Sequence, residues 1–404
     1  MPRTGAGSAP PPCENAPVGP LDLAAAVPDP RVFPARAAAE DAALHRLAEE
    51  SLGASTRQAA DAADVALCRV LAQRLAGEGV GLARLVETAP SVAVARHLWR
   101  LVDRSCAEPA AGATLAVALF GLPLVIVGGI EAAQGEATLP GLVQDVAAIV
   151  ALLREHGALA GNQSIALANA LVAADALDLP RLPEFVAWQR LPDASALPLP
   201  ARSIEPRPLH FSAGAESVHL RFLVGSALAR PGADLFGGRG VEGWGLPLTR
   251  ELGRQLGVGA LSILVLPRPP QRPLRAVEDG RAAQREISAQ LFAGNAIRKL
   301  RASVGEPVVV ISAHRCAEAR ARGELRVSIS SPFEPRDAEG FRCPLYAPDR
   351  VADVVAMLVR LLQDCRVADI RLLDGVHPDR VPGTTHPLLF KPETIPVGAE
   401  LRLH

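Results

Sequence analysis

The spacing of apolar residues changes along the chain, and this change constrains the fold more than any other feature of the sequence. Between residues 36 and 190, apolar side chains recur every three to four positions, which predicts amphipathic helices. Beyond residue 210 they alternate with polar side chains or form short continuous runs, which predicts β-strands. The sequence therefore predicts a helical N-terminal half followed by a C-terminal half of mixed α/β structure.

Proline and glycine mark the expected domain boundaries. Residues 1–34 are rich in both and predict a flexible tail. Residues 191–210 contain five prolines, which fix φ and remove hydrogen-bond donors, so we expect an extended linker there. The linker would separate a mainly helical domain, residues 35–190, from an α/β domain, residues 211–404.

The C-terminal half alternates expected strands and helices in an order typical of a known topology. A strand near residue 262 leads into a long helix over 276–302, then into the strands PVVVIS and ELRVSIS, a second helix and the strand ADIRLLD. This β-α-β-β-α-β order is the split βαβ, ferredoxin-like order of a mixed sheet. A strand over 217–225 would extend that sheet, and a mixed doubly wound sheet is the alternative.

One uncharged segment, residues 109–130, is long enough to cross a bilayer. Three arginines lie just upstream, as the positive-inside rule requires of a membrane span. Against a span, Pro123 and several glycines interrupt the segment, and its alanines are only weakly apolar. We expect a buried β-hairpin over residues 113–128 that turns at residues 120–122, and a single membrane span is the alternative.

Charge and cysteine usage narrow the classes of function. The chain has 42 Lys and Arg against 43 Asp and Glu, a formal net charge of -1, so no global field attracts nucleic acid. Its six cysteines form no CxxC pair, which is typical of a reducing cytoplasm rather than of a disulfide framework. Basic residues are almost all arginine, as a GC-rich bacterial genome would encode. We therefore expect a cytoplasmic protein, and nothing in the charge argues for a nucleic-acid partner.

The common motifs of cofactor and metal sites do not occur in the sequence. There is no P-loop, GxSxG, HExxH or EF-hand loop. The glycines of GRGVEG, residues 238–243, match GxGxxG, but a long loop separates them from the preceding expected strand. The next expected strand ends in proline rather than in an acidic residue that would hold a ribose. No cofactor or metal is therefore assigned.

Polar residues follow two of the expected strands in the C-terminal half. In open α/β sheets, catalytic and binding groups gather beyond the carboxyl ends of strands. His314 and Arg315 follow PVVVIS, and Asp374 and His377 follow ADIRLLD. We expect His314, Asp374 and His377 as catalytic residues, and Arg315 as the substrate-binding residue that holds an anionic group. In the expected strand order these ends lie at opposite edges of the sheet, which weakens a joint site.

The sequence leaves enzyme and non-enzyme functions open. Because no specific catalytic motif occurs, the leading expectation is a regulatory or assembly factor that binds protein partners or itself. The first alternative is an enzyme acting on a small polar metabolite at the strand ends of the α/β domain. The second is a protein anchored in a membrane by residues 109–130.

Overall fold

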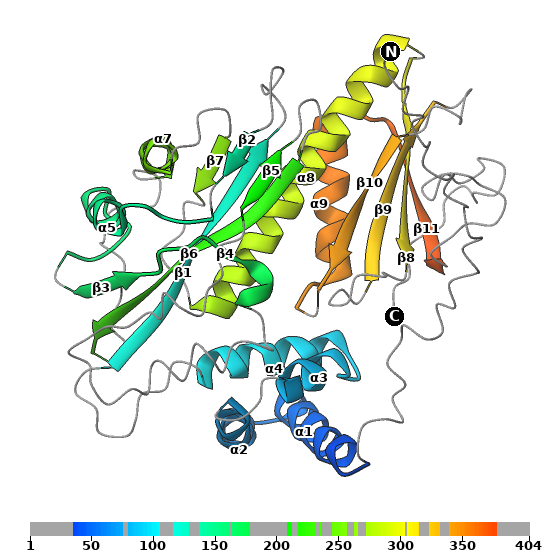
Figure 1. Ribbon diagram of the computed structural model, residues 1–404. Helices are drawn as coiled ribbons and strands as arrows, with labels where there is room; N and C mark the ends of the chain where they lie inside the picture. The colour runs from blue at the N-terminus through cyan, green and yellow to red at the C-terminus, as the bar shows by residue number, and fades with distance from the viewer. Residues whose placement is uncertain are drawn as a thin grey trace, which may run out of the picture. The chain divides into compact units, whose positions relative to one another are not determined.

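In the computed structural model the chain has two units, Met1–Leu44 and His45–His404. The helices and strands of the described residues are labelled in Figure 1. The described residues are 35–75, 80–105, 116–128, 137–139, 141–161, 163–177, 208–211, 217–230, 235, 245–256, 262–265, 272–303, 305–314, 323–331, 339–346 and 348–377. Of the first unit they include only the start of the first helix. The expected tail, most of the expected linker and the GRGVEG segment lie outside them.

Helices open the described chain, as the three-to-four spacing predicts. They are α1 (Ala35–Gly53), α2 (Arg57–Leu75), α3 (Val80–Glu87) and α4 (Val92–Ser105). Ser91 caps α4, because its Oγ accepts a hydrogen bond from the backbone N–H of Val94 at 3.2 Å. The apolar stripe of α4, which includes Leu98 and Leu101, is buried and packs toward α2.

The first sheet takes strands from both sides of the expected linker. Its long central strands, β1 (Ala116–Gly128) and β6 (Ser217–Ala229), pair antiparallel along all 13 residues. Shorter strands complete it: β3 (Ser164–Leu167) and β4 (Val172–Ala173) pair with β6, and β7 (Ser262–Val265) pairs with β1. The two expected domains therefore contribute strands to one sheet.

The described part of the uncharged segment, residues 116–128, forms a single strand, so the expected hairpin that turns at residues 120–122 is wrong. Gly121, which we expected in a turn, lies in the middle of β1 opposite Val224. A Cβ at this glycine would lie 3.0 Å from the Cβ of Ala276, so glycine allows a helix to approach the strand closely. In the described part of the chain, no helix is long and apolar enough to span a membrane.

Helices cover both faces of the first sheet. On one face lie α5 (Val146–Glu155) and α7 (Gly245–Gln255), whose leucines and isoleucine join the apolar core with β1 and β6. The other face carries α8 (Pro273–Ser303). Residues 161–177, which we expected to be helical, instead form β3, β4 and a short 3₁₀ turn (Ala174–Ala176) because they pair with β6. A further two-stranded ladder joins β2 (Ala137–Leu139) and β5 (Leu209–Phe211).

The second sheet has the order β10-β9-β8-β11. Its strands are β8 (Val308–His314), β9 (Gly323–Ser330), β10 (Glu339–Leu345) and β11 (Asp369–His377), and α9 (Val351–Asp364) connects β10 to β11. β11 runs parallel to β8, whereas the other pairs are antiparallel. Mixed α+β structure is thus confirmed. The ferredoxin-like order is not, because β7 belongs to the first sheet and β10 adds a strand before α9.

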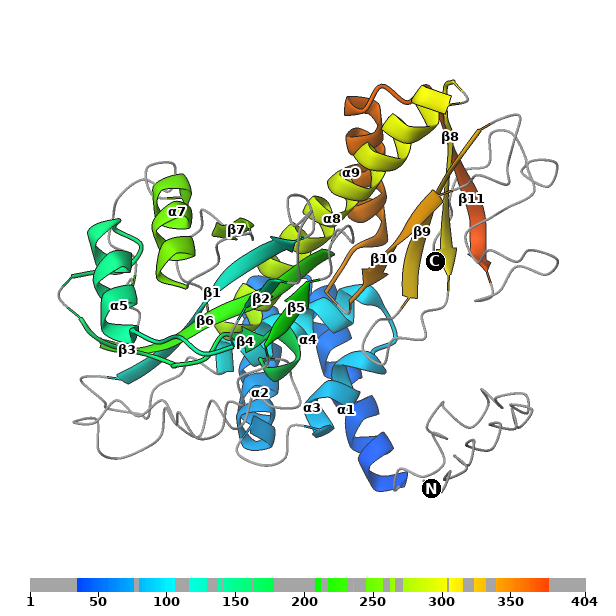
Figure 2. The same cartoon turned by 45° about the horizontal axis from the view of Figure 1, so that its top comes forward.

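Helix α8 belongs to the cores of both sheets (Figures 1 and 2). Near its start, Ala276 and Val277 pack with apolar residues of β1 and β6. About four to seven turns further on, Ala293, Ile297 and Leu300 pack with β8, β9 and α9. Because the helix presents apolar residues to two sheets on different sides, it has no single apolar stripe.

Candidate functional site

The second sheet has one apolar face and one polar face. Alternate residues of its strands, such as Ile311, Val327 and Phe341, pack with α8 and α9. Their neighbours in sequence point to the opposite face, because side chains alternate along a strand. On that face the structure places the polar array, which we define as Ser312, His314, Glu324 and Arg326.

The polar array is buried. The exposed fractions are 0% for Ser312, 1% for His314, 3% for Glu324 and 0% for Arg326. Charged side chains are almost never buried to this degree unless they are paired, since removing them from water is costly. A cluster of buried ionisable groups at strand ends is therefore a candidate functional site.

Strand register arranges the array in two rows. His314 lies opposite Glu324, and Ser312 lies opposite Arg326, in the β8–β9 pair. Arg342 of β10 lies opposite Arg326 on its other side. Because directly opposite residues have Cβ atoms about 5 Å apart, side chains from three strands meet on this face.

Within β8, the hydroxyl of Ser312 contacts the imidazole of His314. Ser312 Oγ lies 2.8 Å from His314 Nε2, within hydrogen-bond distance. The two residues are separated by one position on the same strand, so their side chains share a face. When Nε2 carries no proton, the hydroxyl donates to it, which is the relation between a nucleophile and its general base.

Glu324 brings the charges of the array together. Its Oε1 accepts a hydrogen bond from Arg326 Nε at 2.5 Å and lies 3.9 Å from Arg342 Nε. The Arg326 side chain is fully buried, whereas that of Arg342 is 51% exposed. The buried ion pair thus continues outward to a half-exposed arginine at the edge of the sheet.

Three of the expected site residues lie within two neighbouring parallel strands rather than after them: His314 ends β8, and Asp374 and His377 belong to β11. Since β8 and β11 are parallel, their carboxyl ends lie at the same edge, which removes the objection that they lie apart. His377 is the register partner of His314. Where β8 has one residue, Ser312, β11 has three, residues 373–375, so Asp374 lies in a bulge there. Arg315 and the side chains of Asp374 and His377 lie outside what the structure describes.

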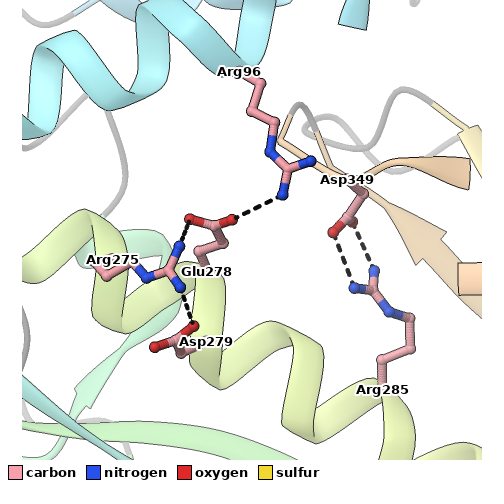
Figure 3. A network of polar contacts seen from close by, with 6 residues as sticks. All are labelled: Arg96, Arg275, Glu278, Asp279, Arg285 and Asp349. Atoms are coloured by element: carbon pink, nitrogen blue, oxygen red, sulfur yellow. Dashed lines mark hydrogen bonds and ion pairs between the residues drawn. The ribbon is translucent and has the colours of Figure 1, made fainter. Parts of the chain in front are cut away.

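An ion pair from α8 holds the far end of β10 in place (Figure 3). Arg285 donates two hydrogen bonds to Asp349, at 2.7 and 2.9 Å, and one to the carbonyl oxygen of Pro344 at 3.0 Å. Burial tends to lower the pKa of Arg285, but the hydrogen bonds and charge of Asp349 outweigh it and hold that pKa above its usual value. The Arg285–Asp349 ion pair therefore stays charged and holds in place the strand that carries Arg342.

Sequence reasoning singled out His314 but not Glu324, Arg326 or Arg342, and it gave Ser312 no role. The alternation of ELRVSIS was visible, and it placed Leu325 and Val327 on the core side. Its polar side would ordinarily face solvent. The alternate positions of Glu324 and Arg326 on a short strand can be recognised in the sequence. Their burial cannot.

The site offers no assigned metal or cofactor ligands. Among the described residues, no group of three or more His, Cys, Asp and Glu side chains could hold a metal ion. No family model, curated protein or solved structure matches the chain. The functional proposal therefore depends on the geometry of the polar array alone.

Proposed function

We propose that the protein is an enzyme that acts on a small polar metabolite, with Ser312 as nucleophile and His314 as general base. The 2.8 Å contact between Ser312 Oγ and His314 Nε2 carries this proposal. Its burial also supports the proposal, because a water-excluded setting strengthens hydrogen bonds and protects a reactive intermediate.

The chemistry is acyl transfer to the serine, followed by hydrolysis. His314 Nε2 takes the proton of the Ser312 hydroxyl as Oγ attacks the carbonyl carbon of an ester. The same nitrogen then gives that proton to the leaving oxygen, which departs as an alcohol. A water molecule, deprotonated by His314, hydrolyses the acyl-serine and restores the hydroxyl.

The leading expectation from sequence, a non-catalytic regulatory or assembly factor, stays a prediction. It rests on the missing catalytic motifs, whereas the hydroxyl–imidazole pair is a specific contact. The mass of the purified protein in solution, alone and in lysate, distinguishes the two. A stable partner complex without chemical reactivity at Ser312 would favour the assembly factor, and cytoplasmic location also stays a prediction.

A fluorophosphonate probe tests the proposal directly, because it forms a covalent bond only with a serine activated by a general base. We expect intact-mass spectrometry to show one added probe on the wild-type protein. Ser312→Ala and His314→Ala should both lose the label, and peptide mapping should place it on Ser312. Circular dichroism of each variant shows whether it is folded.

The matched control is Ser303→Ala at the end of α8, since Ser303 only bonds carbonyl oxygens of its own helix. This variant should label like the wild type. Labelling of folded Ser312→Ala at the wild-type rate, or no labelling of the wild type, would refute the proposal.

A further inference from the structure

Three polar side-chain atoms on one face of α4 are buried without a hydrogen-bond partner. They are Arg96 Nε, Trp99 Nε1 and Asp103 Oδ1. Spacings of three and four residues place these side chains on the same side of the helix. That side faces α8, since Arg96 pairs with Glu278 (Figure 3) and Asp103 lies against Arg272. Each of the three atoms loses its bonds to water when α4 packs on α8 and gains none in return, which weakens the packing.

The ion pairs that join α4 to α8 are long. Arg96 Nη2 lies 3.8 Å from Glu278 Oε1, and Arg272 Nη1 lies 3.7 Å from Asp103 Oδ2. Arg272 also donates a hydrogen bond to the carbonyl oxygen of Asp103, at 3.5 Å. Glu278 is shared, because it accepts a shorter hydrogen bond, of 3.0 Å, from Arg275 of its own helix. Partly exposed ion pairs of this kind contribute little to stability, so water can replace them at small cost.

We propose that α4 separates from α8 together with α2 and α3 while both sheets stay folded, and that the charge of Asp103 controls this opening. The three helices, which we call the helical layer, move together because α2 and α3 pack on α4 and Asp64 of α2 pairs with His97 of α4 at 2.9 Å. The apolar clusters described for the two sheets include no residue of α1–α4, so opening leaves them intact. In the open state water reaches the three buried atoms.

The surroundings of Asp103 set the direction of the pH dependence. Burial raises its pKa from 3.8 to about 6 in the packed state, against the opposing charges of Arg272 and Arg275, while Glu278 adds to the rise. On the side of α2, Asp64 is occupied by His97 and by Arg104 of α4. Opening exposes the Asp103 carboxyl group and returns its pKa toward 3.8. The packed state is therefore favoured most below about pH 4, and it is weakened as the pH rises through about 6.

Hydrogen exchange of the Trp99 indole N–H, followed by NMR, measures the opening, because this buried hydrogen exchanges only when water reaches it. Trp99→Phe identifies its signal among the three tryptophans of the chain. Comparison of the wild type with Asp103→Asn at the same pH cancels the intrinsic pH dependence of exchange. We expect the wild type to exchange about 3-fold faster than Asp103→Asn at pH 4.0 and about 100-fold faster at pH 7.5.

Urea distinguishes opening of the helical layer from unfolding of the whole protein. An opening that exposes little surface hardly depends on urea, so low urea should leave exchange of the Trp99 N–H unchanged while it accelerates the slowest backbone amides of β8. Asp61→Asn, at an exposed carboxylate of α2, is the matched control and should exchange like the wild type. Two outcomes would overturn the proposal: equal Trp99 exchange in the wild type and Asp103→Asn at pH 7.5, or a urea dependence equal to that of the β8 amides.

Discussion

Asp103, near the end of α4, provides a quantitative test of how the helical part of the chain docks on α8. Its side chain is 19% exposed, and its Oδ2 lies 3.7 Å from Arg272 at the start of α8. The backbone N–H of Arg275, in the first turn of α8, also favours the ionised form of this carboxyl group. Its Oδ1 is nevertheless buried without a hydrogen-bond partner.

The pKa of Asp103 sets the expected magnitude. Burial raises this pKa from 3.8 to about 6, against the opposing effects of Arg272 and Arg275. At 1.36 kcal/mol per unit, the ionised form costs the folded state about 3 kcal/mol. Because the folded-state pKa is raised, the stabilising contribution of the protonated form is complete below about pH 4. It is lost as the pH rises through about 6.

Asp103→Asn should therefore stabilise the protein at neutral pH. Asparagine is uncharged and similar in size, so it removes the cost of burying a charge while keeping the packing. We expect urea unfolding at pH 7.5 to show a free energy of unfolding raised by up to about 3 kcal/mol, and at pH 4.0 a change below about 1 kcal/mol. Asp61→Asn, at a 70% exposed carboxylate of α2, is the control and should change little at either pH. A loss of stability at pH 7.5, or an equal gain at both pH values, would refute the reasoning.

Two further substitutions test the packing. Arg285→Met leaves the Asp349 carboxylate buried without its charged partner, so it should lower the free energy of unfolding by ~3–5 kcal/mol. The double variant Arg285→Met with Asp349→Asn should lose much less stability. A loss equal to the sum of the two single-variant losses would contradict this. Gly225→Ala places a Cβ 2.2 Å from Phe120 Cζ and should cost ~1–3 kcal/mol, whereas Gly294→Ala in α8 meets nothing within 4 Å and should stabilise by ~0.5–1 kcal/mol. Thermal unfolding that ranks these glycine variants in the reverse order would show the packing argument to be wrong.

Local patterns predicted most of the elements in the second half. The strands at residues 308–314 and 323–330, the helices α8 and α9, and the start of β11 all follow from periodicity. β10 was not predicted, although Phe341, Cys343 and Leu345 alternate with other residues and only Pro344 is atypical of a strand. Proline is tolerated there because β10 is an edge strand of the sheet.

Strand partners were beyond the reach of these patterns. Strand pairing depends on contacts between residues that are distant in the sequence. The apolar sequences of β1 and β7 would be the same whether the two strands paired with each other or belonged to different sheets. Gly121 shows the limit clearly, because a glycine that suggests a turn locally is required here by a helix more than 150 positions away. The His314 position was predictable from its strand end, whereas its contact with Ser312 required coordinates.

Because α8 serves as a common axis for two sheets, its length and phase are fixed together. Inserting one residue near its middle would rotate everything beyond the insertion by about 100° and extend the axis by about 1.5 Å. The apolar residues of α8 would then no longer face the core of one sheet, while they would still face the core of the other. Insertions and deletions that surface loops tolerate should therefore be excluded from the centre of this helix.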